Sequence, residues 1–204
     1  MELDAIARFL QDVGNDDTDD AGMAELGLAW VARRAAIEVL RPAVARELLT
    51  MTTWCSGTGS RWAERRTTIT GEHGAHIEAT ALWIHLDATT GRPAKWNEQF
   101  ADSYLESAGS RRVDAKLRHD KVVPEGDGMP WFFRKTDMDA FGHVNNAAYL
   151  AIAEEFLDVG DHQRIEIEWH GPSLAGEELR VHRHGGQLWV TTADPSDLRV
   201  TITG

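Results

Sequence analysis

The segment TDMDAFGHVNNAAY occupies residues 136–149 and joins a predicted strand at residues 131–135 to a predicted helix at residues 144–157. The turn between them carries a carboxylate, Asp139, followed by a glycine and a histidine. A helix begins with backbone N–H groups that have no partner inside the helix, so these groups can bind a developing negative charge. A carboxylate beside them can take a proton from water. The segment therefore predicts a catalytic turn, with the N–H groups of residues 143–145 as donors to the charge.

Composition and charge exclude several classes of protein. The chain has 204 residues, 42% of them hydrophobic, and a net charge of −12, which favours a folded core and argues against non-specific binding of nucleic acid. The single cysteine, Cys55, cannot form an intrachain disulfide or a multi-cysteine metal site. The sequence contains no apolar run near the roughly 20 residues of a membrane helix and no signal peptide. We therefore expect a cytoplasmic protein that needs no membrane, metal or cofactor.

The first half of the chain predicts one helix followed by four strands. Apolar residues recur at helical spacing over residues 3–13, and the acidic residues 15–20 that follow predict a solvated loop. Strand-like runs separated by turns follow at residues 28–40, 48–55, 62–70 and 75–86. No strand precedes the helix, so we expect that this unit lacks its first strand.

The second half predicts the same architecture from a different sequence. Residues 99–118 are polar with weak helical spacing, and residues 124–130 form a linker rich in glycine and proline. After the strand and helix around the turn, further strands are predicted at residues 163–169, 179–184, 187–192 and 198–202. A central helix wrapped by a curved antiparallel sheet satisfies both halves and gives an α+β fold. We expect an N-terminal unit at residues 1–98, a connecting segment at 99–130 and a C-terminal unit at 131–204.

Three groups of residues, in this order and spacing, carry a family resemblance. The first consists of TWCSG at residues 53–57 and AERR at 63–66. The second consists of GE at 71–72, ALWIHLD at 81–87 and GRP at 91–93. The third consists of FRKTDMD at 133–139, GHVNN at 142–146 and Tyr149. By these groups the chain resembles the acyl-acyl carrier protein thioesterases, which are tandem hot dog domains. The third group alone fits the wider hot dog superfamily, and the two groups that contain tryptophan favour the carrier-protein branch.

The resemblance implies an enzyme that hydrolyses fatty acyl thioesters on acyl carrier protein without a cofactor. It implies that Asp139 acts as general base or nucleophile and that His143 and Asn145 assist it. The residues expected to bind the substrate are Gly142, Val144, Asn146, Trp30, Trp54 and Trp83. The three tryptophans, together with Leu28 and Ile37, would line an acyl slot in the N-terminal unit, although each suits an ordinary core equally well.

Two further predictions assign structural roles to residues near the turn. Asp137 lies two residues before Asp139, and we expect its carboxylate to form a structural hydrogen bond. Asparagine is a preferred residue at helix starts, so we expect either Asn145 or Asn146 to cap the helix.

The turn departs from the plant members of the family in two ways. Phe141 stands where those enzymes carry an asparagine between the aspartate and the histidine. They also carry a glutamate on a later strand, and that place falls near Pro172 here, with Glu168, Glu177 and Glu178 in the neighbourhood. The site thus resembles a simpler arrangement of one aspartate with helix N–H groups. An acyl-CoA thioesterase and a non-catalytic acyl-binding protein are the alternatives.

An acyl carrier protein is acidic, so an acidic partner such as this chain needs a local basic patch to dock it. One patch is predicted in the connecting segment from Arg111, Arg112, Lys116, Arg118 and Lys121. Another is predicted in the N-terminal unit from Arg33, Arg34, Arg41, Arg65 and Arg66. The sequence leaves open the preferred chain length and whether the protein forms a homodimer.

Overall fold

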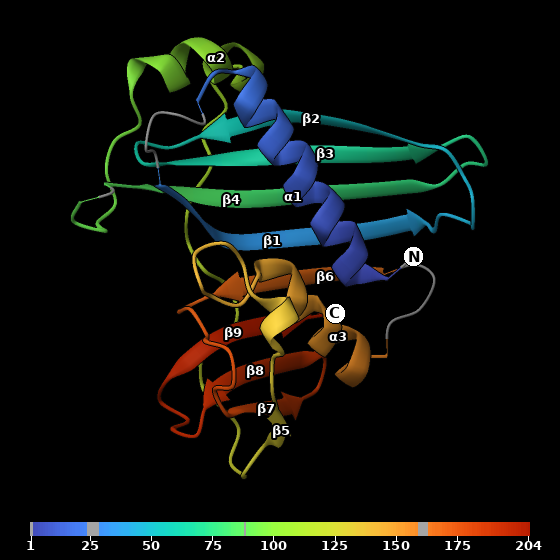
Figure 1. The fold of residues 1–204 in the computed structure, drawn as a ribbon, viewed down its shortest axis with the longest axis vertical. Coiled ribbons are helices and arrows are strands. Elements are labelled where there is room, and N and C mark those ends of the chain that lie inside the picture. Colours follow the sequence, from blue (N-terminus) through green and yellow to red (C-terminus); the bar gives the residue numbers. More distant parts are fainter. Residues whose placement is uncertain (1, 24–28, 88, 159–162) are drawn as a thin grey trace.

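A computed structural model describes residues 2–23, 29–87, 89–158 and 163–204. Its strands form one antiparallel sheet in the order β2-β3-β4-β1-β6-β9-β8-β7-β5, and helices α1 and α3 lie on the same face of this sheet (Figure 1). The sheet and its helices are two hot dog units placed edge to edge, which confirms the predicted α+β fold. We call the face that carries α1 and α3 the inner face of the sheet.

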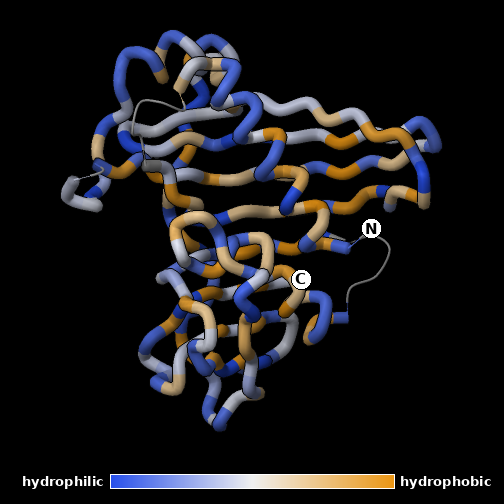
Figure 2. The backbone as a smooth tube through the Cα atoms, in the orientation of Figure 1, coloured by the Kyte–Doolittle hydropathy of each residue, from blue (hydrophilic) through white to orange (hydrophobic). Residues whose placement is uncertain are grey.

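The N-terminal unit consists of one long helix and four strands. They are α1 (Leu3–Asp20), β1 (Ala29–Arg41), β2 (Leu49–Thr58), β3 (Trp62–Gly71) and β4 (His76–Leu86). Alternate residues of a strand share a face, so Ile37, Ile69 and Ile77 all point inward and form a core with Leu3 and Ile6 of α1. Figure 2 shows the apolar residues gathered along the strands, with hydrophilic residues at the turns between them.

The C-terminal unit contains five strands and a helix that begins as a 3₁₀ turn. They are β5 (Met129–Trp131), η2 (Lys135–Asp137), η3 (Asn146–Tyr149), α3 (Leu150–Phe156), β6 (Gln163–Trp169), β7 (Leu179–His184), β8 (Gln187–Thr192) and β9 (Leu198–Thr203). Strand β6 pairs antiparallel with β1, from Arg34 opposite Glu168 to Val39 opposite Gln163, and this pairing joins the two units. The helices of the two units also meet, because the backbone N–H of Leu3 donates to Glu154 Oε1 at 2.7 Å.

The segment between the units begins on the inner face, where Tyr104 donates to Asp17 of α1, and continues over the outer face of the sheet from Arg111 onward. Helix α2 (Glu98–Ala108) is capped by Asn97, whose side chain accepts a hydrogen bond from the N–H of Phe100. The chain beyond α2 then accepts hydrogen bonds from indole groups of both units. Trp62 Nε1 donates to Val113 O at 2.8 Å, and Trp189 Nε1 donates to Asp120 O at 2.8 Å. The part of the connecting segment that follows α2 therefore fastens the two units together on the side away from α1 and α3.

Three predicted elements differ from the observed ones. The acidic residues 15–20 form the end of α1 instead of a loop, because Asp17 pairs with Arg65 at 2.7 Å and accepts a hydrogen bond from the hydroxyl of Tyr104 at 2.9 Å. The strand predicted at 131–135 ends at Trp131, since η2 follows it closely. The helix predicted from residue 144 begins at Asn146.

The two units differ in their first strand. In the described residues β2 is the edge strand of the N-terminal unit, whereas β5 precedes the helix of the C-terminal unit and pairs with β7. The unit boundaries at residues 1–98, 99–130 and 131–204 stay a prediction. None of the described helices is both long and apolar enough to cross a membrane.

Candidate active site

The turn of residues 139–146 is closed by the side chain of its first residue. Asp139 Oδ1 accepts hydrogen bonds from the backbone N–H of Phe141 at 2.9 Å and of His143 at 3.0 Å. The backbone N–H of Asp139 donates in return to His143 O at 2.8 Å. Gly142 has a φ of 80°, a left-handed conformation that favours glycine, and this allows the chain to reverse within so few residues. Among the described residues Asp139 Oδ2 has no partner, so one carboxylate oxygen positions the turn and the other is free to accept a proton.

The N–H groups of residues 143–145 are not available to a substrate, which contradicts the sequence prediction. His143 N–H donates to Asp139, Val144 N–H donates to Ser173 O at 2.9 Å, and Asn145 N–H donates to Asp137 O at 2.8 Å. The prediction was wrong because the helix begins at Asn146, later than expected, and the three preceding N–H groups build the turn itself. Within the described chain the backbone N–H of Asn146 has no acceptor.

Asn145 caps the helix, as predicted for one of the two asparagines. Its Oδ1 accepts a hydrogen bond from the backbone N–H of Ala147 at 2.8 Å. Because Oδ1 faces the helix, the side-chain amide nitrogen of Asn145 faces away from that N–H. The cap therefore fixes one potential donor close to the turn.

Asp137 has a structural role, as predicted. Its carboxylate accepts hydrogen bonds from the backbone N–H, Nε and Nη2 of Arg134, at 2.8, 3.2 and 2.9 Å. The hydrogen bonds from the Arg134 side chain lower the pKa of Asp137, and burial opposes this effect only in part. This carboxylate is thus held ionised on Arg134 and does not contribute a second base.

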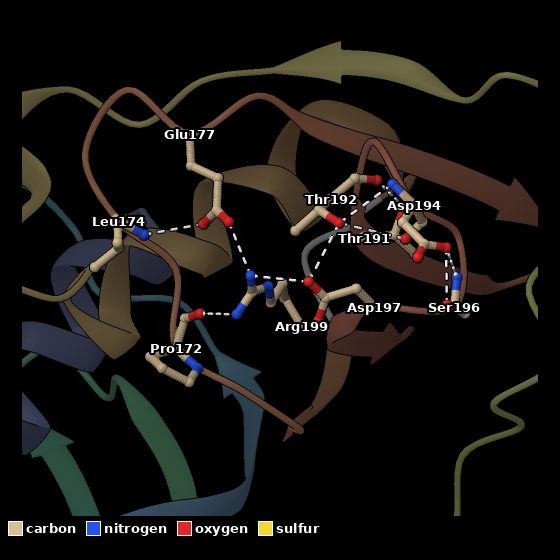
Figure 3. Close-up of polar contacts among 9 residues, drawn as sticks. All are labelled: Pro172, Leu174, Glu177, Thr191, Thr192, Asp194, Ser196, Asp197 and Arg199. Atoms are coloured by element: carbon tan, nitrogen blue, oxygen red, sulfur yellow. Dashed lines mark hydrogen bonds and ion pairs between the residues drawn. The ribbon is translucent and has the colours of Figure 1, made fainter.

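A segment at residues 170–178 supports the turn from the other side. Figure 3 shows Arg199 of β9 at its centre, donating to Pro172 O, to Glu177 Oε1 at 2.8 Å and to Asp197 Oδ2 at 3.0 Å. Glu177 Oε2 also accepts from the N–H of Leu174 at 3.0 Å. Ser173, which receives the N–H of Val144, lies between these two anchors and is fully buried. The roles of Ser173 and Arg199 could not be predicted from the sequence, because they depend on contacts between distant segments.

The glutamates near this segment are occupied elsewhere. Glu177 is bound to Arg199, and Glu178 pairs with Arg180. Glu168 points to the outer face, where it accepts from the N–H of Arg118 at 2.6 Å. Each therefore already has a partner within the chain.

His143 and Phe141 lie at the outside of the turn. The Phe141 side chain is 87% exposed, and His143 is exposed as well. In the part of the chain that the structure describes, no hydrogen bond joins the His143 imidazole to the Asp139 carboxylate. The imidazole is therefore free to reach a substrate rather than engaged in orienting Asp139.

The tryptophans of the N-terminal unit lie on opposite faces of its sheet. Trp83 of β4 stands opposite Ala63 of β3, and Trp30 of β1 packs on Phe100 with ring centroids 5.1 Å apart, so both point inward. Trp54 stands opposite Arg66 and points outward, because its neighbour on β2, Thr53, lies beside the inward Thr67. Trp54 is therefore wrongly predicted as a wall of an inner slot. Ile37 belongs to the core, and Leu28 lies outside the described residues.

Most of the arginines predicted as docking residues are bound within the chain. Arg65 pairs with Asp17, Arg66 with Glu64, and Arg34 donates to Lys116 O. Arg111 donates to Ser56 O and to Glu64 Oε1, both at 2.8 Å. In the connecting segment, Arg112 and Lys116 are exposed and their side chains make no ion pair with described residues.

Two hot dog units with a carboxylate turn on the second define the chain as a double hot dog protein. Residues 1–104 match the family model of the acyl-ACP thioesterase N-terminal domain, and residues 117–201 match that of the C-terminal domain. The chain belongs to the acyl-ACP thioesterase family, as the sequence motifs predicted.

Individual relatives agree with this assignment. An uncharacterised protein of Mycobacterium tuberculosis is 29% identical to the chain and covers 89% of it and 74% of its own length. The chloroplastic oleoyl-acyl carrier protein thioesterase 1 of Arabidopsis thaliana is 24% identical over 82% of the chain, which spans 54% of that protein. The crystal structure of an acyl-ACP thioesterase from Bacteroides thetaiotaomicron superposes with a TM-score of 0.78 at 16% identity, over 99% of this chain and 88% of that one.

Proposed function

We propose that the protein hydrolyses fatty acyl thioesters of acyl carrier protein to a free fatty acid and the carrier thiol. Membership of the acyl-ACP thioesterase family supports the reaction class. The observation that carries the proposal in this chain is the Asp139 carboxylate. One of its oxygens is fixed by two N–H groups of its own turn, and the other has no partner among the described residues.

In the proposed reaction Asp139 acts as general base. Its free oxygen takes a proton from water while the water oxygen bonds to the thioester carbonyl carbon, and the carbonyl electron pair moves onto its oxygen. When that pair returns, the carbon–sulfur bond breaks and its electrons leave with sulfur. The sulfur then takes up a proton, directly or through water, so that an acid and a thiol are released. Asp139 could act instead by direct attack on the carbonyl, which would form an anhydride that water then opens.

The groups around Asp139 have roles that fit this chemistry. The N–H of Asn146 and the side-chain amide of Asn145 are the proposed donors to the developing oxyanion. The exposed imidazole of His143 is proposed to supply the proton to the leaving sulfur. Gly142, which has no side chain, and the backbone next to Val144 allow the thioester to approach the turn closely.

The acyl chain is proposed to bind on the inner face of the N-terminal unit, along Trp30 and Trp83. An apolar chain is stabilised by burial against such rings, by about 0.8 kcal/mol for each methylene removed from water. In this arrangement the N-terminal unit holds the chain and the C-terminal unit supplies the reacting groups.

Parallel assays with two carriers test the proposed function. Purified protein is given the same acyl group on acyl carrier protein and on coenzyme A, and the release of free thiol is measured. We expect kcat/KM to be higher for the carrier protein, because docking adds contacts that coenzyme A lacks. A higher value for coenzyme A would assign the protein to the acyl-CoA thioesterases. Tight binding of both substrates without thiol release would show a non-catalytic acyl-binding protein.

A further inference from the structure

Eight buried side-chain polar atoms have no hydrogen-bond partner among the described residues. Five of them belong to the C-terminal unit: Trp131 Nε1, Tyr149 OH, Trp169 Nε1, Ser173 Oγ and Arg199 Nε. The other three belong to the N-terminal unit: Trp30 Nε1, Trp83 Nε1 and His85 Nε2. A buried polar group without a partner is rare in native proteins, so three on adjacent strands require an explanation.

The three N-terminal groups lie on the inner face and are neighbours. Trp30 of β1 stands opposite His85 of β4, and their ring centroids are 5.1 Å apart. Trp83 lies two residues before His85 on the same strand, so both side chains leave β4 on the same side. Directly opposite and diagonal side chains of an antiparallel pair have Cβ atoms about 5 and about 7 Å apart, so one small ligand group can lie within reach of all three rings.

The neighbouring side chains keep this part of the inner face apolar and leave small groups beside Trp83. Across the sheet, Trp83 stands opposite Ala32 of β1 and Ala63 of β3. Phe100 of α2 covers Trp30, with ring centroids 5.1 Å apart. The side chains directly opposite Trp83 on both adjacent strands are therefore single methyl groups.

The hydrogen positions of the three groups follow from their other contacts. His85 Nδ1 lies 3.0 Å from the carbonyl oxygen of Ala94, which can only accept, so Nδ1 carries the hydrogen. In the neutral ring Nε2 is then a hydrogen-bond acceptor. The indole Nε1 groups of Trp30 and Trp83 can only donate. The three groups, which we call the polar triplet, therefore offer two donors and one acceptor.

A hydroxyl group matches this set completely, because its oxygen accepts two hydrogen bonds and donates one. A carbonyl oxygen would leave His85 Nε2 without a donor, and a methylene group would leave all three unpaired. From this match we infer that the polar triplet binds a hydroxyl group on the acyl chain, and that the protein acts on hydroxyacyl thioesters in preference to saturated ones. The inference rests on the proposed function and narrows its substrate class.

Substrates of one chain length, with and without a hydroxyl group, test the inference. Saturated acyl carrier protein thioesters and a series hydroxylated at successive carbons are hydrolysed by the purified protein, and kcat/KM is measured for each. We expect one hydroxyl position to raise kcat/KM by about tenfold or more over the saturated chain, because a site built to bind a hydroxyl discriminates against a chain that lacks it. Equal values at every position would overturn the inference and would leave the hydrolysis of the saturated substrate, and with it the proposed function, intact.

Variants that keep an aromatic ring but remove the N–H group test whether the polar triplet causes the preference for hydroxylated chains. Trp83→Phe and Trp30→Phe should each lower the preference for the hydroxylated chain by about three- to tenfold, the effect of one hydrogen bond. Trp189→Phe is the matched control, since its N–H is already paired with Asp120 O on the outer face. If both inner variants kept the full preference, the assignment to the triplet would be wrong. Should the protein hydrolyse none of the substrates, calorimetric binding of the corresponding acyl amides would decide the inference separately.

Discussion

The backbone N–H of Val144 donates to the carbonyl oxygen of Ser173 at 2.9 Å. This bond joins the turn that carries Asp139 to the segment at residues 170–178, which Arg199 holds at two points. The position of the proposed base therefore depends on strand β9 as well as on its own turn. Arg199 is thus a positioning residue in this account, since it acts through Ser173 and does not touch the substrate.

Replacing Arg199 tests this dependence. Arg199→Met removes the bonds to Pro172 and Glu177, and we expect kcat to fall by about 10- to 100-fold with a smaller change in KM, because a misplaced base lowers the rate more than binding. Arg199→Lys should recover part of the loss, since a lysine can still pair with Glu177. The control is Arg180→Met, which removes an exposed pair with Glu178. Unchanged kcat in a folded Arg199→Met protein would contradict the positioning role.

Asp137 should contribute stability that depends on pH. Its pKa is lowered in the folded protein, so the contribution is present above the unfolded pKa of about 4 and is lost as the pH falls through the folded value. Asp137→Asn should therefore destabilise the protein at pH 7 by about 1 kcal/mol, a low value because Arg134 is exposed to solvent. Urea unfolding at pH 7 and pH 3 measures the difference. If the free energies of unfolding of variant and parent differed by the same amount at both pH values, the result would argue against the ion pair.

His170 should also make the stability of the protein depend on pH, over a different pH range. Burial lowers its pKa to about 4, so between about pH 6.5 and 4 the unfolded chain binds a proton that the folded protein does not. Stability should thus fall as the pH drops through this window. His170→Gln keeps a partner for Thr201 Oγ1, which lies 3.1 Å from His170 Nε2, and should flatten the slope. The pKa of His182 is also lowered by burial, so some slope should remain. Equal slopes in variant and parent, from urea midpoints at pH 7 and 5, would refute the assignment.

Docking of an acidic carrier protein is predicted to involve Arg112 and Lys116. Both are exposed, whereas Arg111, which the sequence placed in the same patch, is bound to Ser56 and Glu64. Reversing both charges with Arg112→Glu and Lys116→Glu should raise KM for the carrier-protein substrate several-fold at low salt, less at high salt, and leave the coenzyme A substrate unaffected. Identical KM values for the carrier-protein substrate at low salt would place the docking surface elsewhere.

The strands and the local part of the site could be predicted from the sequence because they depend on neighbouring residues. Alternation of apolar residues predicted β6, β7 and β8 with their observed bounds. The N-cap at Asn145 and the structural role of Asp137 also follow from residues a few positions apart.

The remaining features depend on contacts between distant segments. Residues 15–20 were predicted as a loop because the partners of Asp17, Arg65 and Tyr104, lie in β3 and α2. The donors to the oxyanion were misassigned because Val144 N–H is taken by Ser173. Trp54 was placed in the slot because the face on which it lies depends on strand register, which the sequence does not specify by itself.

The central claim is that Asp139 activates water, and Asp139→Asn tests it most directly. Asparagine keeps an oxygen that can accept the N–H groups of Phe141 and His143, so the turn can close as before, but it cannot take a proton. We predict that thiol release from acyl carrier protein thioesters falls by at least about 100-fold while circular dichroism and the unfolding midpoint stay unchanged. Hydrolysis at the parent rate by this variant would contradict the account.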